Sequence, residues 1–450
     1  MKRQDLINNA KSAVRSLRGS GEFGRTAIGA ATRSFYAYDR PLQLGLEAAF
    51  EQRAYRPAQS LCRITLATPP DGHLMHTFFD IDPISPSGRY LATTRVPFVW
   101  RVPYVGDEAQ VCVIDLERST CKAVYTTRGW GTQLGANVQW GADDQTLFCN
   151  DVIARRGRGI SIDLRSLDVK VLEGPIYGLS PDRRYSYSGS IDLINAGQTG
   201  YGVPEYLFRK HKQSEPLSRS EGIWRTDTST GERLLAVSIA DLVAQLPDQQ
   251  HLNGGIYYIY NVKVNPRGDR LLVAIFTRNA SGRMGWPMQL VTCEMDGSNA
   301  KLAVPDSLWR LGGHHANWHP DSEHIVMNLR PDGRNMGFYT FLADGSELRL
   351  IAPGKKGGGH PSINRSGSYL ITDAYVSEGF GNSSDEVPIR IIDLRSNQEQ
   401  HLCYVYTNNI TGGRRVDPHP VWSNNGSRIC FNGIAGDRRQ VFVADAGDLK

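Results

Sequence analysis

Short apolar segments alternate with polar turns rich in Pro, Asp and Gly along most of the chain. Seven such turns follow one pattern, in which an apolar residue opens the turn, at Ile84, Trp140, Leu179, Val264, Trp318, Ile363 and Trp422. An apolar segment typical of a β-strand comes next, such as RLLVAIFT or YLITDAY. This regularity favours one repeated β unit over several unrelated domains.

A second marker follows each of these units. A further apolar strand ends in Asp and a tight turn, at Asp115, Asp163, Asp227, Asp296, Asp344, Asp393 and Asp445. Another strand follows the first six of these, and the strand missing from the seventh unit is found near the start of the chain, in LCRITLAT (61–68). The sequence therefore predicts an all-β fold: a seven-bladed β-propeller over residues 59–450, whose last blade is closed by strand 61–68.

Residues 1–58 lie outside this repeat. The segments DLINNAKSAVRSL and PLQLGLEAAFEQRA have the composition of helices. We expect an N-terminal helical extension that packs on the rim of the propeller and offers a surface for a homodimer.

Composition narrows the class of protein. The net charge is +5, without a run of five or more Lys or Arg, which does not favour nucleic-acid binding. No stretch of apolar residues is long enough to span a membrane. The seven cysteines show no CxxC spacing and the N-terminus has no apolar signal core, so we expect reduced thiols and a cytoplasmic protein.

Histidines recur at one position of the repeat. The position three residues before each opening apolar residue holds Ile81, Asn137, Ile176, Asn261, His315, His360 and His419. Equivalent positions of neighbouring blades converge at the central channel, and three imidazoles meeting there would suit a divalent metal ion. The alternative is that each is a polar channel residue bonded to water. His314 would point away from the channel unless the strand bulges.

The longer connections fall on the face of the propeller where these histidines lie. They carry aromatic and basic residues, which suit an anionic sugar or a similar polyanion. The candidate substrate-binding residues are His76, Asn137, Asn261, His314, Arg414, Tyr201 and His211.

The turn tetrads resemble the TolB-like propeller repeat, and the histidine pattern resembles that of the oligogalacturonate lyases. GGHHANW (312–318) matches the middle-blade His of that family, which implies His315 or His314 as a metal ligand. RRVDPHPVW (414–422) resembles its late-blade Gln…His-x-His cluster, with Asp417 in place of the first His and His419 as the second. Arg414 or Arg415 stands where the Gln would be, and His360 would be an added ligand.

This resemblance implies a seven-bladed, metal-dependent lyase that cuts uronic-acid chains by β-elimination, with manganese as the usual cation and zinc, calcium or another divalent ion as alternatives. The predicted metal ligands are His315, His360 and His419. Elimination needs a base for the C5 proton and a cation to neutralise the carboxylate. We expect His251 or Tyr260 as the base, with nearby cations lowering the pKa of Tyr260, and Arg415 to hold a carboxylate.

Two other functions are compatible with the sequence. A glycoside hydrolase needs two carboxylates across the scissile bond, and Asp80, Asp82 and Asp417 are the nearest candidates. A non-catalytic, TolB-like binding propeller would have no reason to gather three histidines at one channel mouth.

Overall fold

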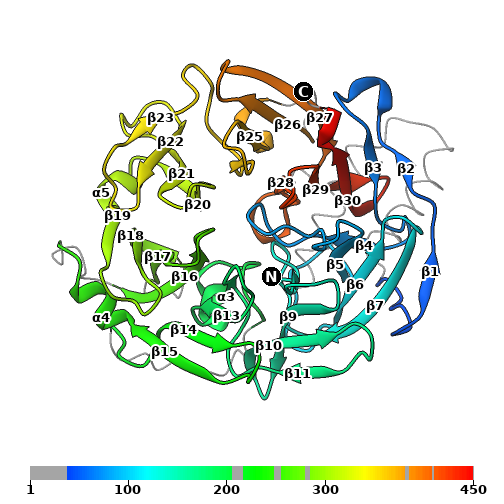
Figure 1. Ribbon diagram of the computed structural model, residues 1–450, viewed down its shortest axis with the longest axis horizontal. Coiled ribbons are helices and arrows are strands. Elements are labelled where there is room, and N and C mark those ends of the chain that lie inside the picture. Colours follow the sequence, from blue (N-terminus) through cyan, green and yellow to red (C-terminus); the bar gives the residue numbers. More distant parts are fainter. Residues whose placement is uncertain are drawn as a thin grey trace, which may run out of the picture.

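The structure is a computed structural model that describes residues 38–204, 216–247, 255–278, 284–380, 385–407 and 410–448. Short antiparallel sheets are arranged around a central axis, and each sheet runs from the axis to the rim (Figure 1). Most of the described secondary structure is β-strand, so the predicted all-β class is confirmed. Helices in this part of the chain are confined to connections, as in α3 (Ile191–Gly197), α4 (Ile239–Ala244) and α5 (Asp306–Trp309).

The strands follow one another around the ring in groups of four. The first three groups are β4 (His73–Met75), β5 (Tyr90–Val96), β6 (Ala109–Asp115), β7 (Thr120–Thr127); β8 (Gln139–Trp140), β9 (Thr146–Ile153), β10 (Arg156–Asp163), β11 (Val169–Val171); and β12 (Gly178–Leu179), β13 (Tyr185–Ser188), β14 (Gly222–Asp227), β15 (Arg233–Ser238). The next two are β16 (Ile256–Val264), β17 (Arg270–Arg278), β18 (Met284–Glu294), β19 (Lys301–Val304); and β20 (Gly313–Trp318), β21 (His324–Leu329), β22 (Gly337–Leu342), β23 (Arg349–Leu350).

The remaining strands except β1 (Glu47–Ala49), which extends the first group, form a nine-stranded sheet. It contains β24 (Ser362–Ile363), β25 (Tyr369–Thr372), β26 (Glu386–Asp393) and β27 (Gln398–Tyr406), and also β28 (Val421–Trp422), β29 (Arg428–Ala435), β30 (Arg438–Asp445), β3 (Ile64–Leu66) and β2 (Arg53–Ala54). A single pair, Tyr406 with Ile434, joins the β24–β27 group to the group built around β29. Backbone pairing between these two neighbouring groups is therefore limited to one pair of residues.

The first and last parts of the chain meet in this sheet. Strand β3, which lies within residues 61–68, pairs with β30 in the register Ile64 with Ala444 (Figure 1, dark blue beside red). Ile64 is 1% exposed and packs in a cluster with Phe442 and Ala444. Burial of this apolar side chain, added to the ladder of backbone hydrogen bonds, holds the N-terminal strand in the C-terminal group.

Replacing Ile64 by alanine should therefore destabilise the whole ring. Truncating a fully buried isoleucine costs about 2–5 kcal/mol, because a cavity remains. The free energy of unfolding in urea measures this cost. Val169→Ala on β11 is a matched control, since Val169 is exposed and its loss should cost less than about 0.5 kcal/mol. Equal costs in the two variants would mean that β3 contributes nothing to closure.

Residues 38–58 form an outer belt and not the predicted helices. Strand β1 (Glu47–Ala49) pairs with β7 and β2 pairs with β3, so the helical prediction for residues 41–54 was wrong. The free backbone groups at the two sheet edges favour strand pairing over the local helix propensity of this segment. Residues 1–37 lie outside the described residues, and the homodimer stays a prediction. Within the described ranges, no helix is long and apolar enough to cross a membrane.

A buried histidine lies where the first and last groups meet. His73 on β4 is 3% exposed, and its Nε2 lies 3.1 Å from Nη1 of Arg438. Burial, with help from the arginines, lowers the pKa of His73 to about 4. The ring is therefore neutral in the folded protein at pH 7.

Stability should fall on acidification because of this group. The unfolded chain binds the His73 proton near pH 6.5, whereas the folded protein binds it only near pH 4, so the unfolded state gains stability as the pH falls through this window. The expected loss is of the order of 2–3 kcal/mol. Urea unfolding from pH 7 to pH 4 would measure it, and His73→Asn should reduce the slope. An unchanged slope would contradict the prediction.

Candidate metal centre

Three imidazoles from neighbouring strand groups meet near the axis of the ring. His315 lies on β20, His360 precedes β24 and His419 precedes β28. The ring centroids of His315 and His360 are 3.8 Å apart in a stacked arrangement, and those of His360 and His419 are 4.3 Å apart, edge to face. His360 and His419 are fully buried, whereas His315 is half-buried. His315 therefore lies at the accessible end of the cluster.

Local backbone conformation turns these side chains inward. His315 and His419 have φ values of 59° and 50°, in the left-handed region that non-glycine residues seldom adopt. The register of β20 with β21 shifts between His314 and Asn317, which is a β-bulge. Because of this bulge, His314 also faces the cluster, and its Nδ1 lies 2.8 Å from Nδ1 of His315. From the alternation of side chains along a regular strand, the sequence had predicted that His314 points away from the channel.

Hydrogen bonds orient two of the three rings. His315 Nδ1 lies 2.7 Å from the carbonyl oxygen of Gly359, and His360 Nδ1 lies 2.9 Å from Oδ1 of Asp373. An Nδ1–H donated in this way leaves Nε2 with a free lone pair. The Asp373 carboxylate also accepts the backbone N–H groups of His360 and His419, at 2.7 and 3.1 Å. Asp373 thus fixes two neighbouring groups at once, and the sequence pattern gave no signal for this role.

A carboxylate completes the cluster. Ligand atoms of His360, Asp417 and His419 all lie within 4.8 Å of one another. Among the described residues, Nε2 of His360 and both ring nitrogens of His419 are buried and have no hydrogen-bond partner. Burial lowers the pKa of His419 well below its usual range, so its ring is neutral, the form that binds metal ions. Such a set of unpartnered nitrogens beside a carboxylate could hold a divalent cation.

Asp417 was not predicted as a ligand. Its Oδ2 lies 3.7 Å from Nε2 of His419 and 2.6 Å from Nε of Arg415. Burial raises the pKa of Asp417, and Arg415 opposes this effect. The sequence resemblance had placed Asp417 two residues before His419, where the family pattern has a His, and the structure brings its carboxylate to the imidazoles.

Arg415 and two tyrosines lie beside the cluster. Arg415 donates through Nε to Asp417, through Nη2 to the hydroxyl of Tyr201, and through Nη1 to the carbonyl oxygen of Gly412 at 3.1 Å. Tyr260 lies 5.9 Å from Tyr201, ring centre to ring centre, and stacks on Phe276 at 4.4 Å. Arg415 lowers the pKa of Tyr260 as expected, but burial outweighs it and raises that pKa well above the usual value. The phenol is therefore neutral at pH 7.

The other predicted binding residues lie in different settings. His76 and Asn137 are buried, and Asn137 Nδ2 donates to the carbonyl oxygen of Ile176 at 2.7 Å, a structural role. Burial lowers the pKa of His76 to about 3, and both its ring nitrogens are unpartnered in the described part of the chain. Arg414 is exposed and donates to the carbonyl oxygen of Trp100 at 3.2 Å.

Asn261 lies on β16 and is half-buried. His211 and His251 lie outside the described residues. The structure thus brings together His314, His315, His360 and His419 with Arg415, Tyr201 and Tyr260.

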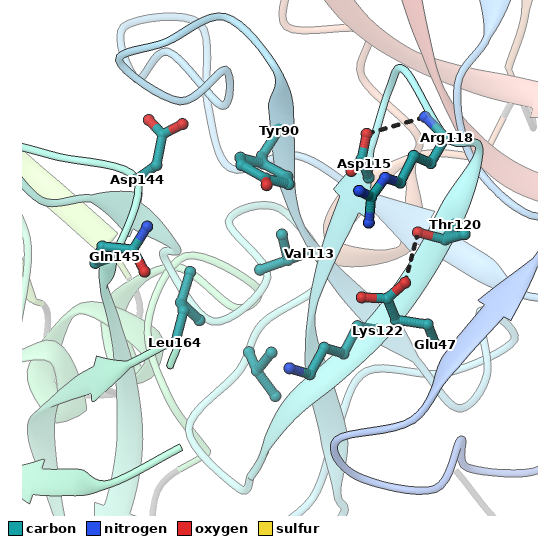
Figure 2. Close-up of a pocket in the computed structure, with 11 residues that line it drawn as sticks. Glu47, Tyr90, Val113, Asp115, Arg118, Thr120, Lys122, Asp144, Gln145 and Leu164 are labelled. Atoms are coloured by element: carbon teal, nitrogen blue, oxygen red, sulfur yellow. Dashed lines mark hydrogen bonds between the residues drawn. The ribbon is translucent and has the colours of Figure 1, made fainter. Parts of the chain in front are cut away.

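A cavity of about 210 Å³ lies elsewhere, between the first two strand groups (Figure 2). Glu47 on β1 and Lys122 on β7 line it, with Tyr90 at the start of β5 and Asp144 from the turn before β9. Acidic and basic side chains both face it, and its lining includes none of the candidate residues. The metal cluster near the axis therefore remains the better candidate site.

Comparison with known proteins shows which solved structures share this fold. No protein-family model and no curated protein matches the sequence. Among solved structures, an oligogalacturonate lyase in complex with manganese matches with a TM-score of 0.63 at 16% identity, covering 91% of this chain and 100% of that one. The oligogalacturonate lyase from Vibrio parahaemolyticus matches with a TM-score of 0.60 at 15% identity, covering 90% of this chain and 98% of that one. This chain has the oligogalacturonate lyase fold.

The likeness to oligogalacturonate lyases extends over the described strand groups, as the sequence resemblance implied. A putative TolB from Agrobacterium tumefaciens also matches, at 13% identity and a TM-score of 0.40, covering 72% of this chain and 93% of that one. At these identities the oligogalacturonate lyase structures establish the architecture, and the chemistry has to be argued from the residues of this chain.

Proposed function

We propose that this protein is a metal-dependent lyase that cleaves uronic-acid-containing oligosaccharides by β-elimination, on a closed seven-bladed propeller. The observation that carries the proposal is the cluster of His360, Asp417 and His419, whose buried imidazole nitrogens lack partners in the described part of the chain. The cluster lies beside Arg415 in a chain with the oligogalacturonate lyase fold. Metal ligands next to a fixed guanidinium suit an anionic sugar.

His360, Asp417 and His419 would hold the cation, with His315 at the accessible end as a further ligand. Manganese is the cation of the similar lyase structure, and we propose it here. When bound, the cation supplies positive charge that acidifies the C5 proton next to the uronate carboxylate. Nitrogen and oxygen donors of this kind accept manganese and other divalent ions.

Arg415 would orient the carboxylate of the substrate. A guanidinium has five N–H donors, and the three bonds to Asp417, Tyr201 and Gly412 leave two of them for a ligand. These bonds also hold the planar group in one position, which reduces the entropy lost on binding. The half-buried side chain remains accessible.

The elimination itself needs an acid and a base. Of the two bases expected from the sequence, Tyr260 stays protonated, so we propose that His251 accepts the C5 proton as the C4–O bond breaks and a C4=C5 double bond forms. The bonding electrons leave with the glycosidic oxygen, which must be protonated. Tyr260 is a neutral phenol whose ring lies 5.9 Å from that of Tyr201, the hydrogen-bond partner of Arg415, and it can donate that proton. Solvent then returns a proton to Tyr260 and removes the one held by His251.

The decisive experiment is incubation of the purified protein with a panel of polyuronates and their oligomers. Elimination creates a conjugated double bond that absorbs in the ultraviolet, whereas hydrolysis creates new reducing ends without this absorbance. Removal of metal with a chelator should abolish the signal, and manganese should restore it. Reducing ends alone would favour a glycoside hydrolase, and no cleavage of any polyuronate would favour a binding propeller.

The state of the cysteines supports a cytoplasmic location, which we also propose. All seven are free thiols, and all are buried. Proteins of oxidising compartments commonly use their cysteines in disulfides.

A further inference from the structure

One segment of the first strand group leaves its sheet and crosses the channel. Met75 on β4 pairs with Thr94 on β5, and the next pair between these two stretches is Ile84 with Leu91. Residues 76–83 therefore lie opposite only Ala92 and Thr93. The surplus length cannot remain in the ladder, so it protrudes towards the axis. We refer to residues 76–83 as the channel insert.

The channel insert is anchored to several strand groups. The backbone N–H of His76 donates to Oδ1 of Asn432 on β29 at 3.0 Å, and the Thr77 hydroxyl donates to the carbonyl oxygen of Val138 at 3.0 Å. Asp82 accepts the backbone N–H of Asn424 at 2.6 Å. These bonds fix both ends of the insert to groups on either side of it.

A buried ion pair fixes the middle of the insert. Nζ of Lys263 on β16 lies 2.8 Å from Oδ2 of Asp80, and the side chains are only 7% and 11% exposed. The same ammonium donates to the carbonyl oxygen of Ala316 at 2.8 Å and lies 4.4 Å from the centre of the Phe79 ring. A buried pair of charges seldom adds much stability, but it strongly disfavours any other arrangement of the segments it joins.

The insert places two phenyl rings against the imidazoles. The ring of Phe78 lies 4.6 Å from that of His419 and 5.8 Å from that of His360, both edge to face. Phe79 lies 5.5 Å from His315 and 5.4 Å from His360. Both phenylalanines are at most 5% exposed, so their rings are packed against the cluster and shielded from solvent.

The three imidazoles differ in what orients them. His315 and His360 are held by hydrogen bonds to Gly359 and Asp373. Neither ring nitrogen of His419 has a hydrogen-bond partner within the described residues. Its ring is instead held edge to face between Phe78 and His360. Metal-ligating histidines normally rely on a hydrogen bond for this orientation.

We propose that Phe78 is the positioning residue of His419, taking the place of the missing hydrogen bond, and that the Asp80–Lys263 pair holds Phe78 in place. The proposal rests on the metal site of the proposed function. Under this proposal, Phe78 and Asp80 of the first strand group and Lys263 of the fourth determine metal affinity. None of the three is a proposed metal ligand. The proposal also gives the channel insert a role that the lyase chemistry alone does not require.

The test is a direct measurement of manganese affinity in Phe78→Leu, which keeps an apolar side chain but removes the ring. We expect affinity to fall about tenfold or more, as when an outer partner of a metal ligand is lost. The visible spectrum of the cobalt(II)-loaded variant should also change, because His419 is free to rotate. The double variant Asp80→Asn/Lys263→Gln removes both charges together, and we expect a smaller loss in the same direction.

Phe431→Leu is the matched control, because Phe431 on β29 is fully buried in the same group as His419 and stacks on Phe442. We expect it to lower the melting temperature while leaving manganese affinity within about twofold of the parent, because its ring stacks on Phe442 and not on an imidazole. Circular dichroism verifies that each variant is folded. Parent-like affinity and an unchanged cobalt spectrum in Phe78→Leu would overturn the proposal. A parent protein that binds no divalent cation would instead refute the metal site itself.

Discussion

Replacing His360 by alanine should leave the protein without usable metal affinity. His360 lies between His315 and His419, and its buried Nε2 has no hydrogen-bond partner among the described residues. Loss of an outer partner alone typically costs 10–100-fold in metal affinity, so loss of this ligand should cost roughly 100-fold or more. Titration with manganese, followed by the elimination assay, would measure both consequences.

His401→Ala is the control for this experiment. His401 lies on β27, half-buried, with Nδ1 2.8 Å from the hydroxyl of Tyr404. Its removal changes the histidine count without touching the cluster, so metal affinity should not change. A His360→Ala variant that retains the manganese affinity of the parent would exclude the cluster as the metal site.

Replacing Arg415 by lysine should slow turnover by about 10²–10³-fold, the usual cost of losing a positioned donor to developing negative charge. An ammonium cannot reproduce the planar fork that binds Asp417, Tyr201 and a carboxylate together. We expect kcat/KM on a uronate oligomer to fall while manganese content stays close to that of the parent. Steady-state kinetics with metal analysis on the same sample separates the two.

Arg414→Lys, the same substitution at the neighbouring residue, is the matched control for this variant. Arg414 is exposed and donates to the carbonyl oxygen of Trp100, whereas Arg415 binds Asp417. Its replacement should change kcat/KM by less than about threefold, the range of exposed polar contacts. Similar losses in the two variants would show that the basic charge of this loop matters and the placement of Arg415 does not.

Periodic features of the fold were predictable from the sequence because they depend on local pattern. Each apolar strand and each Pro, Asp and Gly turn has its own signal, and repetition makes the combined signal strong. The shared register of His315, His360 and His419 came from the same periodicity, and the three rings do lie together.

Features that break the period were not predictable in this way. The bulge that turns His314 inward and the insert that carries Phe78 are departures from regular pairing. Asp373 acts through contacts with another strand group, which no local pattern encodes. Residues 41–54 have helix-forming composition, but the free edges of β7 and β3 decide their conformation.

The outer belt has a consequence for the order in which the ring assembles during synthesis. Strand β3 leaves the ribosome well before its partner β30, because all the other strand groups lie between them in the sequence. Strand β1 can pair with β7 as soon as the first group is complete, and β2 can pair with β3. The belt can therefore hold β3 beside the growing protein and cover one of its edges until the C-terminal strands arrive. Shortening residues 38–58 should then lower the yield of folded protein from a nascent chain more than it lowers the stability of the finished ring.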